Sequence, residues 1–131
     1  MLPTWARCLV CPQVKGNPYR GRINGLKKLV VSKTINDCSW NATVIAGDLP
    51  TELREIKHQS GGDIMKYGIT QLDNTLLASG LVDEYHLWIM RLRVGEGKRT
   101  FADVDPSLVN LELFATHTFQ NGAVTLSCFA R

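Results

Sequence analysis

The sequence lacks any apolar run that approaches the ~20 residues needed to span a bilayer. Its first stretch, MLPTWARCLVCPQVKG, also lacks the long apolar core and the small-residue cleavage site of a secretory signal. We therefore expect a cytoplasmic protein with no membrane partner. The 131 residues, 44% hydrophobic and 21% charged, have the composition of a folded globular domain and are enough for a real core. Disordered and fibrous classes are excluded by the same composition.

Cysteine is scarce, with four residues at positions 8, 11, 38 and 128. Cys8 and Cys11 have the C-x-x-C spacing of a zinc half-site or a redox pair. A zinc site needs a second pair, which the isolated Cys38 and Cys128 do not form, and a redox pair needs a following helix, which Pro12 opposes. We expect reduced thiols and no metal, since the three histidines show no ligand spacing either.

Basic charge is also thinly spread. The net charge is +3, and the basic residues are dispersed apart from Arg91, Arg93, Lys98 and Arg99. A nucleic-acid surface shows a denser basic stripe with aromatic residues between the charges. We expect no nucleic-acid partner, and keep salt-dependent binding through this cluster as an outside alternative.

The chain is predicted to be one domain, residues 1–131, with an irregular segment at 1–26 and a core at 27–131. Prolines and glycines interrupt the first segment, in which residues 8–11 suit a short strand. Strands are then predicted from β-branched runs. Two helices are predicted from helical spacing of apolar residues, the first beginning after Asp48 and the second ending before Gly80. The predicted strands are 28–32, 42–46, 64–67 and 85–91, and the predicted helices are 49–59 and 72–79.

Strands that alternate with helices predict a parallel βαβαβ unit. The pattern changes toward the C-terminus, where apolar residues alternate on both sides of Asn121-Gly122, a hairpin signal. The predicted class is therefore α/β, with a mixed, mostly parallel sheet flanked by helices and a C-terminal antiparallel hairpin.

Ligands of open α/β sheets bind beyond the carboxyl ends of parallel strands. Ser32, Lys33 and Thr34 place two hydroxyls and an ammonium at one such end, which suits a phosphomonoester or is merely a polar loop. Gly68, Ile69 and Thr70 lead from another end into a helix. That loop suits a phosphate, or Gly68 forms a turn and Thr70 caps the helix.

No catalytic residue can be assigned, because the sequence has no G-x-S-x-G, paired-carboxylate or Cys/His motif. Hydride transfer needs none of these, since a nicotinamide cofactor performs it. The absence is compatible with a reductase without indicating one.

Several segments, taken in order, resemble the dihydrofolate-reductase-like superfamily. They are KLVVSKT (28–34), WNATVIAGD (40–48), GGDIMKYG (61–68), LDNTLLASGLVDE (72–84) and VGEGKRTF (94–101). The nearest branch is the reductase domain of bacterial bifunctional riboflavin biosynthesis proteins. The similarity covers about residues 17 to 131, and the segments are specific as a set although each is weak alone.

The resemblance implies an NADPH-dependent reductase that acts on a pyrimidine- or pteridine-like small molecule. It places Ser32–Thr34 beside the adenosine 2′-phosphate and the loop of Gly68, Ile69, Thr70, Gln71 and Leu72 around the pyrophosphate. Gly47, at the end of the strand predicted at 42–46, is a further candidate cofactor-binding residue from the sequence pattern. A homodimer or higher homo-oligomer is also implied. Two departures are the β-branched Ile69, where relatives carry a small residue, and Arg91, where relatives commonly carry proline. A non-catalytic oligomeric binding or scaffold module of the same fold is the alternative function.

The resemblance starts past the family's first ~60 residues. The chain is therefore expected to be truncated. Because those residues carry much of the substrate pocket in the family, inactivity of the truncated chain is a possible consequence. In the family, the strands of that segment flank the strand predicted here at 64–67. A strand that lacks both neighbours tends to pair with another chain. We expect oligomerisation, or residues 5–14 as a substitute strand, to fill the gap.

Overall fold

The computed structural model describes residues 18–35, 40–97 and 99–131. The strand predicted at 8–11 and the substitute strand at 5–14 lie outside these residues. The chain divides into two compact units, Met1–Glu52 and Leu53–Arg131, and each is described by itself. The division falls within one helix. The prediction of one domain stays a prediction.

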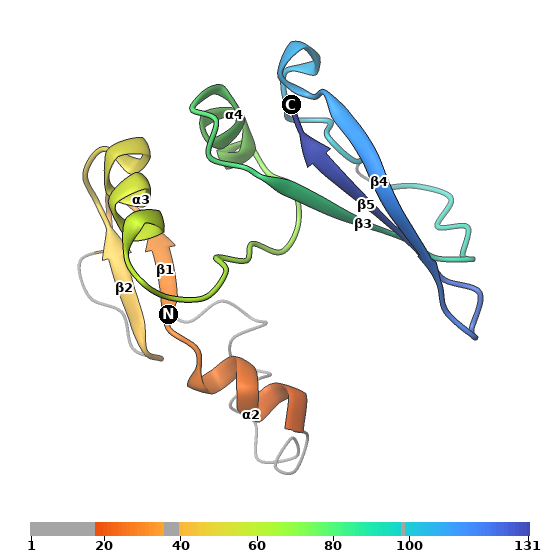
Figure 1. Cartoon of the computed structure of the whole chain (residues 1–131), viewed down its shortest axis with the longest axis horizontal. Coiled ribbons are helices and arrows are strands. Elements are labelled where there is room, and N and C mark those ends of the chain that lie inside the picture. The colour runs from red at the N-terminus through yellow and green to blue at the C-terminus, as the bar shows by residue number, and fades with distance from the viewer. Residues whose placement is uncertain (1–17, 36–39, 98) are drawn as a thin grey trace. The chain divides into compact units, whose positions relative to one another are not determined.

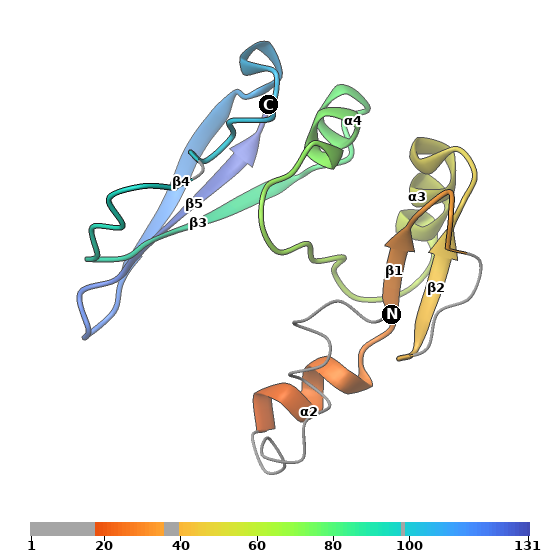
Figure 2. The same ribbon diagram turned by 180° about the vertical axis from the view of Figure 1, so that it is seen from behind.

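The first unit contains a parallel pair of strands. Strands β1 (Lys28–Val31) and β2 (Ala42–Ile45) form at the two β-branched runs that predict them. Their register pairs Lys28 with Ala42 and Val31 with Ile45, so both strands end at the same edge, as Figure 2 shows. Ile45 is 3% exposed and forms the core of this pair.

Helix α2 (Pro18–Gly25) lies where the sequence predicts irregular chain, so that part of the prediction is wrong. Pro18 suits the first helical position, where a missing N–H costs nothing. Side chains from later in the sequence donate hydrogen bonds to the other end of the helix. The Trp40 indole donates to Asn24 Oδ1 at 2.8 Å, and Lys28 Nζ donates to the Asn24 carbonyl. These contacts come from residues after the helix, so the glycine-rich sequence alone gives no sign of it.

Helix α3 (Leu49–His58) begins as predicted, after Asp48. The Asp48 carboxylate accepts hydrogen bonds from the Thr51 N–H at 3.1 Å and from the Thr51 hydroxyl at 2.6 Å. A side-chain oxygen at this position satisfies an N–H that has no partner within the helix. Pro50 in the first turn is tolerated for the same reason as Pro18.

The second unit contains a three-stranded antiparallel sheet. Strand β5 (Val124–Ala130) lies between β3 (Glu84–Ile89) and β4 (Leu111–Thr118), as Figure 1 shows. The α/β class and the hairpin of β4 and β5 are confirmed. The mostly parallel sheet is wrong, because parallel pairing is limited to β1 and β2 among the described strands. Alternating helices and strands do not reveal which strands pair, and β3 pairs with a strand that lies far along the chain.

The strand predicted at 64–67 does not form. A strand of four residues needs a hydrogen-bonded neighbour to be stable. No strand in the described residues pairs with this segment. Met65 and Tyr67 are each 68% exposed. The β-propensity of the segment is therefore not enough to make it a strand.

The turn between β4 and β5 has the chemistry that the sequence predicts but is longer. Phe119 N–H donates to the Ala123 carbonyl at 2.8 Å, which leaves residues 120–122 as the loop. Gly122 adopts a φ of 81°, a conformation that glycine takes without strain. Asn121 Oδ1 accepts from the Ala123 N–H at 3.0 Å and closes the turn.

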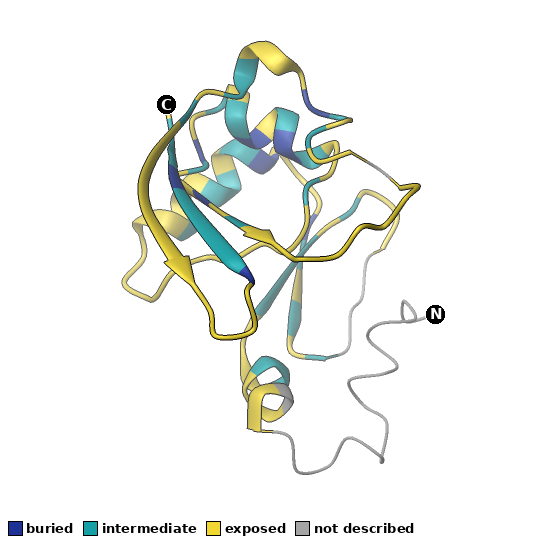
Figure 3. Ribbon diagram, turned by 90° about the vertical axis from the view of Figure 1, so that its right-hand side faces the viewer, coloured by how far each residue is buried: buried dark blue, intermediate teal, exposed yellow. Residues whose placement is uncertain are grey.

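Helix α4 (Leu72–Ala78) forms where apolar spacing predicts it, and a short 3-10 helix, η2 (Pro106–Leu108), follows later. α4 ends at Ala78, and Gly80 follows its C-cap residue Ser79 with a φ of 61°. Strand β4 is exposed along most of its length, whereas β5 is more covered, as Figure 3 shows. The buried hydrophobic side chains of this unit are Leu76, Leu81, Tyr85, Val104, Ala123 and Cys128. No described helix has the length and apolar character to cross a membrane.

Candidate functional site

The predicted phosphomonoester residues form a tight turn at the end of β1. The Ser32 N–H donates to the Ile45 carbonyl at 3.1 Å, which continues the β1–β2 pairing by one residue. Ser32 Oγ accepts hydrogen bonds from the N–H groups of Thr34 at 3.2 Å and Ile35 at 3.1 Å. Lys33 and Thr34 are exposed. The turn therefore presents one ammonium and a hydroxyl to solvent, while the Ser32 hydroxyl is used internally.

Gly47 lies at the same edge of the parallel pair, because it follows the end of β2. Its N–H donates to Glu52 Oε1 at 3.0 Å. A Cβ on Gly47 would clash with that oxygen, so a larger residue here would make the end of the Glu52 side chain shift. The Glu52 carboxylate occupies the donor, and an anion placed at Gly47 meets a negative charge.

The loop before α4 is open. Gly68 has a φ of 77°, and a Cβ there would meet no atom within 4 Å. Within the described part of the chain, the N–H groups of Gly68, Ile69 and Gln71 donate no hydrogen bond. Three unused N–H donors beside open space form a surface that can accept an anion.

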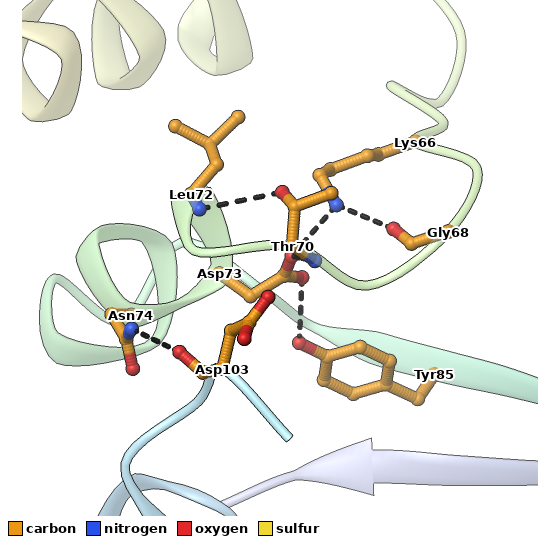
Figure 4. Close-up of polar contacts among 8 residues, drawn as sticks. All are labelled: Lys66, Gly68, Thr70, Leu72, Asp73, Asn74, Tyr85 and Asp103. Carbon is orange, nitrogen blue, oxygen red and sulfur yellow. Dashed lines mark hydrogen bonds and ion pairs between the residues drawn. The ribbon is translucent and has the colours of Figure 1, made fainter. Parts of the chain in front are cut away.

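One buried carboxylate organises this loop, as Figure 4 shows. Asp73 Oδ2 accepts from Lys66 Nζ at 2.7 Å and from the Thr70 N–H at 2.8 Å. Its other oxygen, Oδ1, accepts from the Tyr85 hydroxyl at 3.0 Å. The Lys66 ammonium also donates to the Gly68 carbonyl. Asp73 thus connects both ends of the loop to strand β3.

The contacts of Asp73 decide its charge. Burial by itself raises the pKa of a carboxyl group, but the Lys66 ammonium, the Thr70 N–H and the Tyr85 hydroxyl together hold the pKa of Asp73 below its ordinary value. Burial and the neighbouring Asp73 charge raise the pKa of the Tyr85 phenol. At neutral pH the site therefore contains an aspartate paired with an ammonium, and a neutral phenol.

The sequence contained a signal for this network that our reading of it missed. Thr70 and Asp73 have the S/T-x-x-D/E spacing of a capping box before an apolar run. The structure shows one half of that motif, because the Thr70 N–H donates to Asp73, whereas Thr70 Oγ1 accepts from the Leu72 N–H at 3.3 Å and not from that of Asp73. Nothing in the local sequence points to Tyr85, because its contact with Asp73 depends on where β3 lies.

The network continues on the far side of α4. Asn74 Nδ2 donates to the Asp103 carbonyl at 2.7 Å, and Asn74 Oδ1 accepts from the Asp105 N–H at the same distance. The Phe101 ring meets the Tyr85 ring edge to face, with centroids 5.4 Å apart. The start of α4 is thus held from both sides.

A serine, a histidine and a glutamate also come together on the sheet. His86 Nδ1 lies 3.0 Å from Ser127 Oγ, and His86 Nε2 lies 3.3 Å from Glu84 Oε2. Strand β5 is central, so its backbone N–H groups are committed to its neighbours and cannot stabilise an oxyanion. His86 and Glu84 are exposed. The group does not have the features of a nucleophilic site.

The residues present fit parts of a dinucleotide cofactor. The open loop with its three N–H donors suits a pyrophosphate, and Lys33 with the Thr34 hydroxyl suits a phosphomonoester. Ile69 itself is partly covered, whereas Gly68 and Thr70 on either side of it are exposed. No cluster of three or more potential metal ligands occurs in the described residues.

Comparison with known proteins identifies the family. The protein YyaP of Bacillus subtilis (strain 168), named as uncharacterized, is 36% identical over 104 residues, or 79% of this chain. The chain spans 55% of that relative's length. The model of the RibD C-terminal domain family matches residues 7–125, which is most of the chain. The chain therefore belongs to the RibD C-terminal domain family, a placement consistent with the dihydrofolate-reductase-like superfamily.

Proposed function

We propose that the chain is an NADPH-dependent reductase domain that acts on a pyrimidine- or pteridine-like small molecule. The observation that carries this proposal is the loop at 66–72, in a chain of the RibD C-terminal domain family. This loop has three N–H groups that donate to no other described residue. NADPH, when bound, supplies the hydride. The chain's own residues bind and orient the cofactor.

In this proposal each unit has its own group of binding residues, and each group is matched to its own part of the cofactor. Lys33 and Thr34 hold the adenosine 2′-phosphate through one ammonium and one hydroxyl, with Ser32 shaping their turn. The N–H groups of Gly68, Ile69 and Gln71 hold the pyrophosphate. Gly47, Thr70 and Leu72 contribute backbone beside these groups. The phosphate charges are matched by donors without any metal ion.

The assembly proposed is a homodimer or higher homo-oligomer in the cytoplasm. Large apolar side chains are exposed on the second unit, with Trp88 at 61% and Leu113 at 54%. Strands β3 and β4 each have one edge unpaired by any described strand. A second copy would cover such surfaces, since exposed edges and apolar patches favour association. Light scattering that shows a monomer would contradict this.

A non-catalytic binding or scaffold module of the same fold is the second candidate. Glu52 favours it, because its carboxylate occupies the Gly47 N–H. The Asp73 carboxylate also accepts the Thr70 N–H at the predicted pyrophosphate loop. The Glu52 carboxylate opposes a phosphate at Gly47, and the Thr70 N–H is not available to a phosphate because Asp73 accepts it.

Titration with NADPH separates the two functions. A reductase is expected to bind NADPH, with a change in the emission of Trp40 or Trp88, and to oxidise it in the presence of a pyrimidine or pteridine acceptor. Lys33→Met should weaken the binding of NADPH more than the binding of NADH, because only NADPH carries the 2′-phosphate. Lys27→Met is the matched control on the same strand region. No binding at millimolar NADPH would contradict the reductase function and favour the scaffold.

A further inference from the structure

The carboxylate of Asp73 is an unusual group in this protein. It is 3% exposed, and no other charged side chain is buried in the parts of the chain that the structure describes. A buried carboxylate is strongly unfavourable unless it is paired and hydrogen-bonded. Both of its oxygens are used, by Lys66, Thr70 and Tyr85. Because the buried carboxylate needs all of these hydrogen bonds, it fixes the positions of the chain segments that donate them.

One partner of Asp73, Lys66, belongs to a segment with few other constraints. Residues 61–69 form no helix or strand, and all except Ile69 are exposed. Apart from Tyr67, which has a contact of its own, the hydrogen bonds of this segment to the rest of the described chain run through Lys66 to Asp73. The position of Gly68 is set by the same ammonium, which donates to its carbonyl.

Tyr85 connects this arrangement to rigid structure. It lies in β3, where it pairs with the buried Cys128 of β5. Its phenol donates to the oxygen of Asp73 that Lys66 does not use. The carboxylate is therefore held by the sheet on one side, and it holds the loop on the other.

We propose that Asp73, held by Tyr85, is a positioning residue that fixes the 66–72 loop in the conformation that binds the pyrophosphate of NADPH. This inference rests on the proposed function. In this arrangement Asp73 touches no ligand. It acts through Lys66 and Thr70, and the free N–H groups of the loop are aligned before the cofactor arrives. Pre-alignment improves affinity because the loop then loses little freedom on binding.

The test compares two ligands on the full chain by isothermal titration calorimetry. NADPH uses the loop, whereas adenosine 2′-monophosphate carries only the phosphomonoester assigned to Lys33 and Thr34. Asp73→Asn keeps the shape of the side chain and removes the charge that holds Lys66. We expect the Kd for NADPH to rise about tenfold and the Kd for adenosine 2′-monophosphate to stay unchanged. A merely structural role would weaken both ligands together.

Tyr85→Phe is the second variant, and it decides the test if Asp73→Asn does not fold. It removes one hydroxyl outside the loop, and we expect the Kd for NADPH to rise about threefold without an effect on adenosine 2′-monophosphate. Asp83→Asn is the matched control. Asp83 forms an ion pair with Lys57, and its side chain is 75% exposed. The substitution therefore removes the negative charge of an exposed Lys–Asp pair. Its NADPH affinity should equal that of the wild type.

The outcomes separate the two proposals. If the wild type binds NADPH and both Asp73→Asn and Tyr85→Phe bind it equally well or more tightly, the positioning role is overturned while the proposed function stands. Equal weakening of both ligands also overturns the positioning role. If the wild type binds neither ligand, the proposed function fails and the inference fails with it.

Discussion

Helices α3 and α4 both begin beside a carboxylate of their own sequence, but in different surroundings. At α3 the Asp48 side chain is exposed and accepts two hydrogen bonds from Thr51. At α4 the Asp73 side chain is buried and joins a lysine, a backbone N–H and a phenol. The same residue type is a local cap in one place and a tertiary connection in the other. We therefore expect burial, rather than the capping motif, to decide how much each carboxylate contributes to stability.

Removing the buried carboxylate should have the largest effect. Asp73→Ala leaves the Lys66 ammonium and the Tyr85 hydroxyl without their partner, and we expect the free energy of unfolding to fall by about 3 kcal/mol. Urea denaturation followed by tryptophan fluorescence measures this. The control is Asp83→Ala, for which we expect a loss of no more than about 0.5 kcal/mol, because the Lys57–Asp83 pair is exposed. Equal losses in the two variants would remove the distinction between buried and exposed carboxylates.

Acid should remove much of the same contribution. The pKa of Asp73 is lowered in the folded protein, so its stabilising effect is present above the unfolded value of about 3.9 and is lost as the pH falls through the folded value. The difference in unfolding free energy between wild type and Asp73→Asn should therefore be largest near neutral pH and shrink below about pH 4. Denaturation curves at a series of pH values check this. A difference that does not depend on pH would mean that the charge of Asp73 contributes nothing.

Removing the phenol hydroxyl should have a smaller effect. Tyr85→Phe keeps the ring against Phe101 and removes one hydrogen bond to Asp73, so we expect a loss of about 1.5 kcal/mol at neutral pH. The pKa of Tyr85 is raised on folding, so its contribution is complete below the unfolded value of about 10 and declines as the pH rises above it. The wild type should therefore lose stability at alkaline pH more steeply than Tyr85→Phe. The same slope in both proteins would contradict the buried position of the hydroxyl.

Of these substitutions, removing the exposed cap should lower the free energy of unfolding least. Asp48→Ala loses the oxygen that satisfies the Thr51 N–H, and we expect a loss of about 1 kcal/mol, which thermal denaturation can detect. Asp48→Asn keeps a capping oxygen and should remain within a few tenths of the wild type. A loss as large as that of Asp73→Ala would show that the start of α3 is more than a local cap.

Local elements were predictable where the sequence carries its own signal. Strands β1 and β2 follow β-branched runs, α3 follows the Asp48 cap, and the β4–β5 hairpin surrounds Asn121-Gly122. The reason is that strand propensity, capping and turn chemistry act over a few residues. The hairpin loop was predicted one residue too short, which is a small change in the same chemistry.

Elements that depend on a partner were not predictable in the same way. Residues 64–67 have strand propensity but no strand among the described residues to pair with, and α2 forms although its sequence has two glycines. β3 was expected in a parallel sheet, yet it pairs antiparallel with β5. In the candidate site, the glycine loop was identified from its sequence, whereas Lys66, Asp73 and Tyr85 were not.

By itself, the sequence determined the family, the short strands, the helix that follows Asp48 and the position of the glycine loop before α4. Only the tertiary structure decided which strands pair and that the Asp73 carboxylate is buried with Tyr85, twelve residues away. The physical reason is that propensities and caps depend on neighbouring residues, whereas burial and strand pairing depend on residues that folding brings together. A carboxylate at the start of a helix looks alike in the sequence in both cases, but its surroundings in the folded protein give it a different role.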